Sequence, residues 1–126
     1  MSKRDELRKQ IQGASARRYA TVAVPGQPEY LIRSLTMKEK GENELIPVNI
    51  KTGTIDTSKM SQQKCDLLCR SVVDPDDREP LFATSEWQIW ESVAAPITSR
   101  LVAEIDKLNE GQAVEGLVGN SDTTGG

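Results

Sequence analysis

The sequence predicts an α+β fold that is mostly α-helical, with a small β-hairpin near the N-terminus at about residues 19–33. The evidence for strands is a period of two in the side chains over 19–24 and again, after a turn, over 29–33. The evidence for helices is a period of 3.6 residues, which begins at Ser58 and is clearest over 95–109. A helical body that packs on one hairpin satisfies both patterns.

The N-terminal part is expected to form a helix over about residues 3–14, fading at Gly13, and then the hairpin. Ser2 stands three residues before Asp5, which is the spacing of a side-chain cap at a helix N-terminus. The hairpin turns at Pro25-Gly26, because proline presets φ at one central position of a type II turn and glycine accepts the positive φ of the next.

Two helices and a connection follow in the middle of the chain. Thr36 and Glu39 have the spacing of a capping box and open a short charged helix, which Gly41 should weaken or end. Residues 45–57 mix β-branched residues with proline and glycine, so a short hairpin and an ordered loop both fit. The next helix covers about 58–73, and its apolar stripe consists of Met60, Cys65, Leu68, Cys69 and Val72.

An acidic loop over 74–80 separates this helix from the C-terminal ones. We expect Asp76 and Asp77 to be exposed, and Leu81 and Phe82 after them to be buried.

A short helix is then predicted over 85–92 and a longer one over 95–109. Pro96 suits the first turn of the longer helix, because the N–H group that proline lacks would have no partner there. Asn109 and Gly111 should end it.

The domain organisation follows from charge and composition. Residues 1–18 form a basic N-terminal helix or arm, with six basic residues against two acidic ones and a net charge of +4, whereas the whole chain carries −3. Residues 19–111 form a single globular domain. Residues 112–126 are rich in glycine and small polar residues and are predicted to be a flexible tail.

The composition points away from a compact enzyme. Only 4% of the residues are aromatic and 37% are hydrophobic, which is little for the core of a chain of 126 residues. A protein that depends on partners fits this composition better than one with a deep substrate pocket. No apolar run approaches the 18 residues of a membrane span, and the N-terminus lacks the apolar stretch of a secretory signal, so we expect a cytoplasmic protein.

The residues that usually carry catalysis are missing or poorly arranged. The chain has no histidine, its carboxylates lie in polar runs, and no serine occupies a Gly-x-Ser-x-Gly turn. The acidic loop fails the EF-hand pattern twice, since counting from Asp74 the sixth residue is Glu79 and the twelfth is Ser85. We therefore expect no enzymatic activity, no cofactor and no metal.

The two cysteines, Cys65 and Cys69, are spaced i, i+4 on one helical face. This spacing is poor for a disulfide between them, because the helix holds the two side chains a turn apart. We interpret them as buried thiols.

The candidate partner-binding residues are two tryptophans and four arginines. Trp87 and Trp90 share a helical face, where a core role and a recognition patch are both open, because tryptophan is enriched at interface hot spots. The basic residues could line the solvated side of an amphipathic helix, bind an acidic neighbouring subunit or bind nucleic acid. The arginines concerned are Arg4, Arg8, Arg17 and Arg18.

The order of several short segments resembles that of the tail assembly chaperones of long-tailed phages. These proteins carry a Val-Asp-x-Asp-Gly-x-x-Leu-Phe segment between two helices, and here Val73-Asp74-Pro75-Asp76 leads to Leu81-Phe82. An early helix comes before it, and Leu35-Thr36-Met37-Lys38-Glu39 is similar to a Leu-Thr-x-x-Glu segment of the family. The resemblance spans about residues 1–110. Residues 42–58 are more polar than in the family, and the acidic loop has no glycine at its turn.

The resemblance implies a non-enzymatic role in the cytoplasm of the bacterial host. Proteins of this family coat the tape measure protein before the tail tube forms around it. They also help to recruit tail tube subunits, mainly through a longer product made by a ribosomal frameshift. It further implies homo-oligomerisation, which the thin core and the opposite charges of arm and body also favour.

Two other classes stay open at this point. One is a virion structural protein of the tail completion or connector type. The other is a small nucleic-acid-associated regulatory protein that uses the basic arm, although a pI near 5.0 disfavours a polyanionic ligand.

Overall fold

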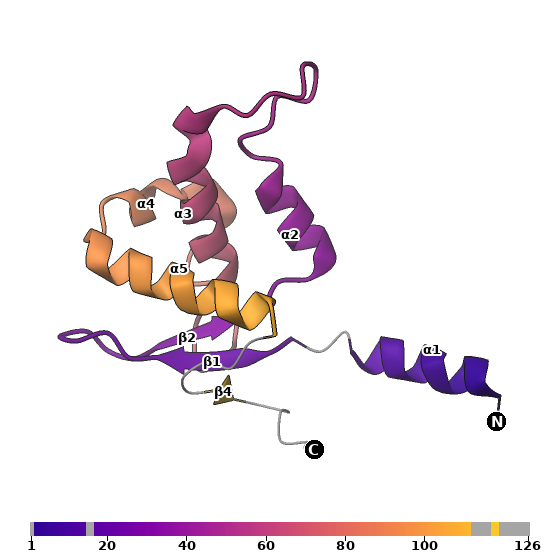
Figure 1. Cartoon of the computed structure of the whole chain (residues 1–126). Helices are drawn as coiled ribbons and strands as arrows, with labels where there is room; N and C mark the ends of the chain where they lie inside the picture. The colour runs from indigo at the N-terminus through magenta and orange to yellow at the C-terminus, as the bar shows by residue number, and fades with distance from the viewer. Residues whose placement is uncertain (1, 15–16, 112–116, 119–126) are drawn as a thin grey trace.

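The computed structural model shows helices α2–α5 on one face of a small antiparallel sheet, with helix α1 projecting away from them (Figure 1). It describes residues 2–14, 17–111 and 117–118. The predicted α+β, mostly helical class is confirmed. The elements are α1 (Lys3–Gly13), β1 (Tyr19–Val22), β2 (Tyr30–Arg33), α2 (Met37–Glu44), a 3₁₀ turn (Thr57–Lys59), α3 (Met60–Ser71), β3 (Val72–Val73), a second 3₁₀ turn (Thr84–Glu86), α4 (Gln88–Glu91), α5 (Ala95–Asn109) and β4 (Leu117–Val118).

The predicted hairpin forms the centre of the sheet, whose strand order is β3-β2-β1-β4. Tyr19 pairs with Arg33 and Val22 with Tyr30, so the register is set by the turn between the strands. At that turn the Gln27 N–H donates to the Val24 carbonyl at 2.9 Å, and Gly26 has a φ of +80°. These features match the predicted type II turn.

The two faces of the hairpin have different coverings. Ala20, Val22 and Ile32 point toward the helices and have no exposed surface. On the other face the acidic loop folds back, and the Arg78 guanidinium lies 4.3 Å from the centre of the Tyr19 ring. The loop that the sequence marks only as acidic therefore also shields the second face of the sheet.

The core lies between the sheet and helices α3 and α5. Of the stripe predicted for α3, Cys65, Leu68 and Cys69 are buried in the helix, whereas Met60 is 40% exposed and Val72 lies in β3. Helix α5 begins and ends where expected, with its proline in the first turn. Helix α1 begins as predicted too, since the Ser2 side chain accepts from the Asp5 N–H at 3.2 Å. The largest fully buried apolar side chains are Ile32, Leu68, Leu101, Ile105, Leu108, Val22, Val72, Val73 and Cys69.

Several expectations need correction. The helix predicted to reach residue 73 ends at Ser71, because β-branched Val72 and Val73 pair with β2 as strand β3. Gly41 does not end α2, which continues to Glu44. The helix predicted over 85–92 is a 3₁₀ turn followed by the short α4.

The hydrogen bonds explain why α2 continues through its glycine. The capping box forms, because the Glu39 N–H donates to Thr36 Oγ1 at 3.3 Å and the Thr36 N–H donates to Glu39 Oε1 at 2.9 Å. Beyond the glycine, Asn43 Nδ2 donates to the Asp66 carboxylate of α3 at 2.9 Å. These polar contacts at both ends offset the weak helix propensity of Gly41.

The predicted tail mostly lies outside the described residues. Within it, Leu117 and Val118 form β4 and pair with Ala20 and Tyr19 at the free edge of β1.

Leu81 and Phe82, the two residues after the acidic loop that we expected to be buried, lie in different environments. Asp76 and Asp77 are exposed as predicted, but Leu81 is 43% exposed, so its predicted burial is wrong. Phe82 is half-buried, and its ring meets that of Trp90 edge to face with centroids 5.9 Å apart. Leu81 instead lies at the surface, while the next side chain turns inward to the aromatic partner.

Replacing Phe82 with alanine is expected to lower the free energy of unfolding by about 2 kcal/mol, because half-burial and one edge-to-face contact are lost. Leu81→Ala is the matched control and should cost less than about 0.5 kcal/mol, as surface changes do. Urea unfolding followed by tryptophan fluorescence measures both. Equal losses for the two variants would contradict the burial described here.

Candidate protein-interaction surfaces

The two predicted tryptophans occupy different environments. Trp90 is 5% exposed and belongs to the core, so it is not an open recognition patch in the isolated chain. Its Nε1–H has no hydrogen-bond partner among the described residues. Trp87 is half-buried against the core from the turn before α4. The helical spacing that suggested one shared face therefore describes a contact with the core rather than an exposed pair.

The four predicted arginines fall into two groups. Arg4 and Arg8 lie on exposed α1. Arg17 and Arg18 belong to the body instead, since Arg17 forms two hydrogen bonds with Glu39 of α2, at 2.6 and 2.9 Å, and the Arg18 side chain donates to the Leu108 carbonyl at 3.3 Å. The two arginines fix the root of the arm, and only α1 itself stands clear of the domain.

The Arg17–Glu39 pair should make stability depend on acid pH. The hydrogen bond from Arg17 holds the pKa of Glu39 at about 2, well below its ordinary 4.5. A depressed carboxyl pKa contributes stability above the unfolded value, and this contribution is lost as the pH falls from about 4.5 toward 2. Because Glu39 is partly solvated, we expect a contribution of roughly 1–2 kcal/mol.

The measurement is urea unfolding of the wild type and of Glu39→Gln at pH 7, 4 and 2.5. The variant should be less stable than the wild type at pH 7, and the difference should shrink with falling pH and be smallest at pH 2.5. Glu44→Gln is the control, because Glu44 pairs with Lys40 in a position where both side chains are about half exposed. A difference between Glu39→Gln and wild type that is constant with pH would contradict the assignment.

Helix α1, which we call the arm helix, has none of its residues buried. Leu7 and Ile11 lie one turn apart and are 48% and 73% exposed. Arg4, Arg8 and Gln12 line the same face, so the apolar pair is bordered by basic side chains. An amphipathic helix with an uncovered apolar stripe is a common means of binding a protein groove.

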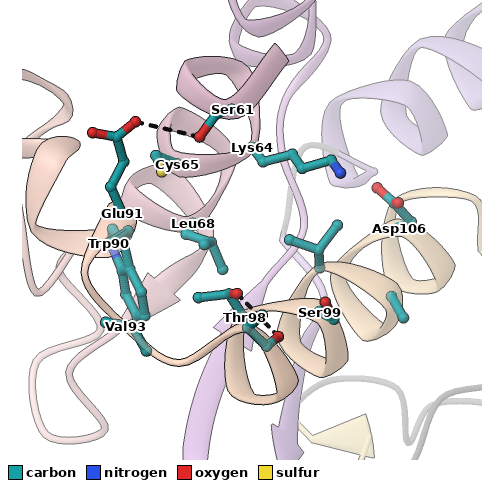
Figure 2. A pocket seen from close by; sticks show the side chains of 13 residues that line it. Ser61, Lys64, Cys65, Leu68, Trp90, Glu91, Val93, Thr98, Ser99 and Asp106 are labelled. Carbon is teal, nitrogen blue, oxygen red and sulfur yellow. Dashed lines mark hydrogen bonds between the residues drawn. The ribbon is translucent and has the colours of Figure 1, made fainter.

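Helices α3, α4 and α5 enclose an open groove of about 540 Å³, which we call the α3–α5 groove. Leu68, Val93 and Val102 supply apolar side chains to its wall, and Glu91 and Asp106 supply carboxylates. Figure 2 shows Ser61 of α3 donating to Glu91, at 3.3 Å, across one end of the groove, while Asp106 and Lys64 point toward one another at the other. The groove thus combines an apolar floor with charged ends.

The segment between α2 and α3 forms a second exposed surface. It extends from the body at the end opposite the sheet (Figure 1) and is closed by a bridge between Val48 and Ile55. Of the two conformations that fit the sequence, the short hairpin is the one closer to the structure. The exposed apolar side chains of this segment and of the first residue of α3, which we call the apolar projection, are Leu45, Ile50, Ile55 and Met60, with exposures of 54%, 81%, 57% and 40%.

No family model matches this chain, and no curated protein or solved structure matches it. The function must therefore be argued from the exposed surfaces and from the resemblance carried by residues 1–110.

Cys65 and Cys69 are buried free thiols, as predicted, and burial raises the pKa of both, that of Cys69 to about 11. Among residues 2–14, 17–111 and 117–118, no group of three or more acidic residues or cysteines is arranged to hold a metal ion. No helix in the described part of the chain is long and apolar enough to span a membrane.

Neither the α3–α5 groove nor the apolar projection was predicted from the sequence. The groove joins residues from three helices, and no local pattern links Cys65 to Val102. The projection had a visible signal, because isolated Ile50 and Ile55 stand among proline, glycine and polar residues that cannot bury them. This signal was interpreted as ambiguous secondary structure rather than as exposed apolar surface.

Proposed function

We propose that this protein is a non-enzymatic phage tail assembly chaperone that coats the tape measure protein in the bacterial cytoplasm. The observation that carries the proposal is the apolar projection, which presents four large apolar side chains to solvent on a segment that stands away from the core. Clustered exposed apolar residues mark surfaces that bind other proteins. The apolar stripes of a long helical protein are ligands of matching chemistry.

The size of the chain suits a coating role. One projection covers only a short stretch of a long helical partner, so each contact is modest. When many copies bind side by side and also contact each other, their contributions add through effective concentration. Modest single contacts would also allow the tail tube subunits to displace the coat when the tube polymerises. We include homo-oligomerisation in the proposal for this reason.

Recruitment of tail tube subunits is the second part of the proposal. It rests on the resemblance, which implies a longer product carrying the tube contact. Sequencing of the gene and mass spectrometry of the expressed products test it: a slippery heptamer and a second, longer product are the expected findings. A single product would remove the frameshift part and leave the coating role.

The direct test is co-expression with the tape measure protein of the same phage. We expect the wild-type chain to keep that protein soluble and to co-purify with it. The variant Leu45→Ser/Ile50→Ser/Ile55→Ser should lose this activity yet keep its melting temperature, because the replaced side chains are exposed. The matched control is Met37→Ser, which removes a still more exposed apolar side chain, 93% accessible, from α2.

Three outcomes would count against the proposal. Full activity of the triple variant would detach the function from the projection. Persistence of the protein in finished particles would favour the tail completion or connector class. Salt-dependent DNA binding that requires Arg4 and Arg8 would favour the nucleic-acid class.

A further inference from the structure

The arm helix and the α3–α5 groove have complementary chemistry. The arm presents Leu7 and Ile11 beside Arg4 and Arg8. The groove presents apolar side chains with Glu91 at one end and Asp106, which faces Lys64, at the other, so an apolar stripe with a basic border matches both its apolar floor and its excess of carboxylates. On the opposite face of the arm, Glu6 and Lys9 carry opposite charges and offer no such match.

One carboxylate of the groove gains most from a new cation. Desolvation and the nearby charge of Glu110 raise the pKa of Asp106, while the charge of Lys40 opposes this shift. An arginine placed beside it would offset these effects with its positive charge and form a charge-assisted hydrogen bond. Arg4 and Arg8 are the basic side chains that border the apolar pair on the arm.

The lengths also match. The arm helix has 11 residues and extends about 16 Å at 1.5 Å per residue. The part of α5 that lines the groove runs from Ala95 to Asp106, a span of the same order. One arm therefore covers the groove from the Glu91 end to the Asp106 end.

We propose that the arm helix of one copy of this protein lies in the α3–α5 groove of a second copy, with Leu7 and Ile11 on the groove floor. The arm of each copy is poorly placed to reach the groove of the same copy. Arg17 and Arg18 fix the root of the arm beside Ser34 and Leu108, and the arm points away from the helical body (Figure 1). A second hollow, lined by Lys40, Glu44 and Glu110 among others, lies between that root and the groove.

The contact is heterologous, because arm and groove are different surfaces and each bound copy still offers one of each. Repetition of such a contact builds a row of copies or, if the rotation closes, a ring. The proposed function includes self-association of the chain, and the contact between arm and groove would provide it. To this extent the contact rests on the proposed function. The contact itself requires only this chain, so its test contains no tape measure protein.

Disulfide trapping between two differently labelled copies is the first test. Leu7→Cys protein is mixed with Ser99→Cys protein, since Ser99 is an exposed residue of the groove wall. After mild oxidation, mass spectrometry should find the peptide pair that joins positions 7 and 99 of different copies. Lys9→Cys, on the opposite face of the arm, is the matched control and should give at least a fivefold lower yield.

Equal yields for Leu7→Cys and Lys9→Cys would overturn the proposal, because the arm would then have no preferred face. A chain carrying both Leu7→Cys and Ser99→Cys provides a further test. If it closes only on itself and stays monomeric at high concentration, the arm occupies its own groove and the proposal is wrong.

Sedimentation of the untagged protein is the second test. Wild-type chains should associate with rising concentration and less so at high salt, because charged groups contribute to the contact. Leu7→Ala/Ile11→Ala keeps helix propensity and should raise the dissociation constant at least tenfold. Glu6→Ala/Lys9→Ala, which leaves the net charge unchanged, should associate like the wild type.

A wild-type chain that is monomeric at all concentrations would overturn the proposal, and so would unchanged association of Leu7→Ala/Ile11→Ala. Retained solubilisation of the tape measure protein by a non-associating variant would leave the proposed function in place without this contact. Full solubilisation by the projection variant together with normal association would do the reverse, leaving the arm–groove contact in place without the proposed role of the projection. The two ideas can therefore fail separately.

Discussion

Replacing Leu101 with alanine is expected to lower the free energy of unfolding by about 3–4 kcal/mol. Leu101 has no exposed surface and lies on the face of α5 that packs against α3 and the sheet. Its truncation removes apolar contacts and leaves a cavity that neighbouring helices fill only in part. A domain of this size has a total stability of about 5–15 kcal/mol, so the change removes a large share of it.

Thermal and urea unfolding measure this effect. The melting temperature should fall by roughly 10 °C or more, given about 4–8 °C per kcal/mol for a domain of this length. Ser99→Ala, on the exposed side of the same helix, is the control and should stay within about 0.5 kcal/mol of the wild type. If Leu101→Ala lowered the free energy of unfolding by less than about 1 kcal/mol, Leu101 would not be part of the packed core.

Asp66→Ala is expected to cost about 3 kcal/mol, because its carboxylate joins two polar groups in a nearly closed site. Asp66 is 6% exposed and accepts from Asn43 Nδ2 at 2.9 Å and from Arg70 Nε at 2.8 Å. Arg70 in turn donates to Glu42 at 3.0 Å. Without the carboxylate, the Asn43 amide and the Arg70 guanidinium lose an acceptor where little water can replace it.

A double-mutant cycle separates the pair from its surroundings. Arg70→Met keeps much of the stem volume, and the double variant Asp66→Ala/Arg70→Met should lose less stability than the sum of the single losses. Lys40→Met is the control for removing a charge from a helix surface, since Lys40 pairs with Glu44 and both side chains are about half exposed. Additive losses at Asp66 and Arg70 would show that the two groups act independently.

The sequence predicts those parts of the fold that rest on periodicity and turn chemistry. The hairpin and α5 follow directly from alternation, from Pro25-Gly26 and from the i, i+4 spacing of Leu101 and Ile105. Val72 and Val73 were misassigned because their conformation depends on a free edge of β2, which no local pattern reveals. Leu81 was misassigned because hydrophobicity alone does not tell which of two adjacent apolar residues points inward.

The candidate surfaces were predicted only in part. The basic character of the arm is visible in the sequence, and Arg4 and Arg8 remain its exposed basic residues. Arg17 and Arg18 are indistinguishable from them in sequence, because their partners Glu39 and Leu108 are brought together only by the fold. For the same reason the groove, built by three helices, was not foreseen.

The strand order has a consequence for synthesis of the chain. β1 and β2 leave the ribosome early, but the strands that flank them come from residues 72–73 and 117–118. The hairpin must therefore wait with both edges open until much of the chain has been made, and an isolated hairpin is marginally stable in water. Pairings between residues far apart in sequence also form slowly. Newly made chains consequently pass through a period in which the sheet is incomplete. During this period the chain exposes strand edges of its own, although it is proposed to protect another protein from aggregation.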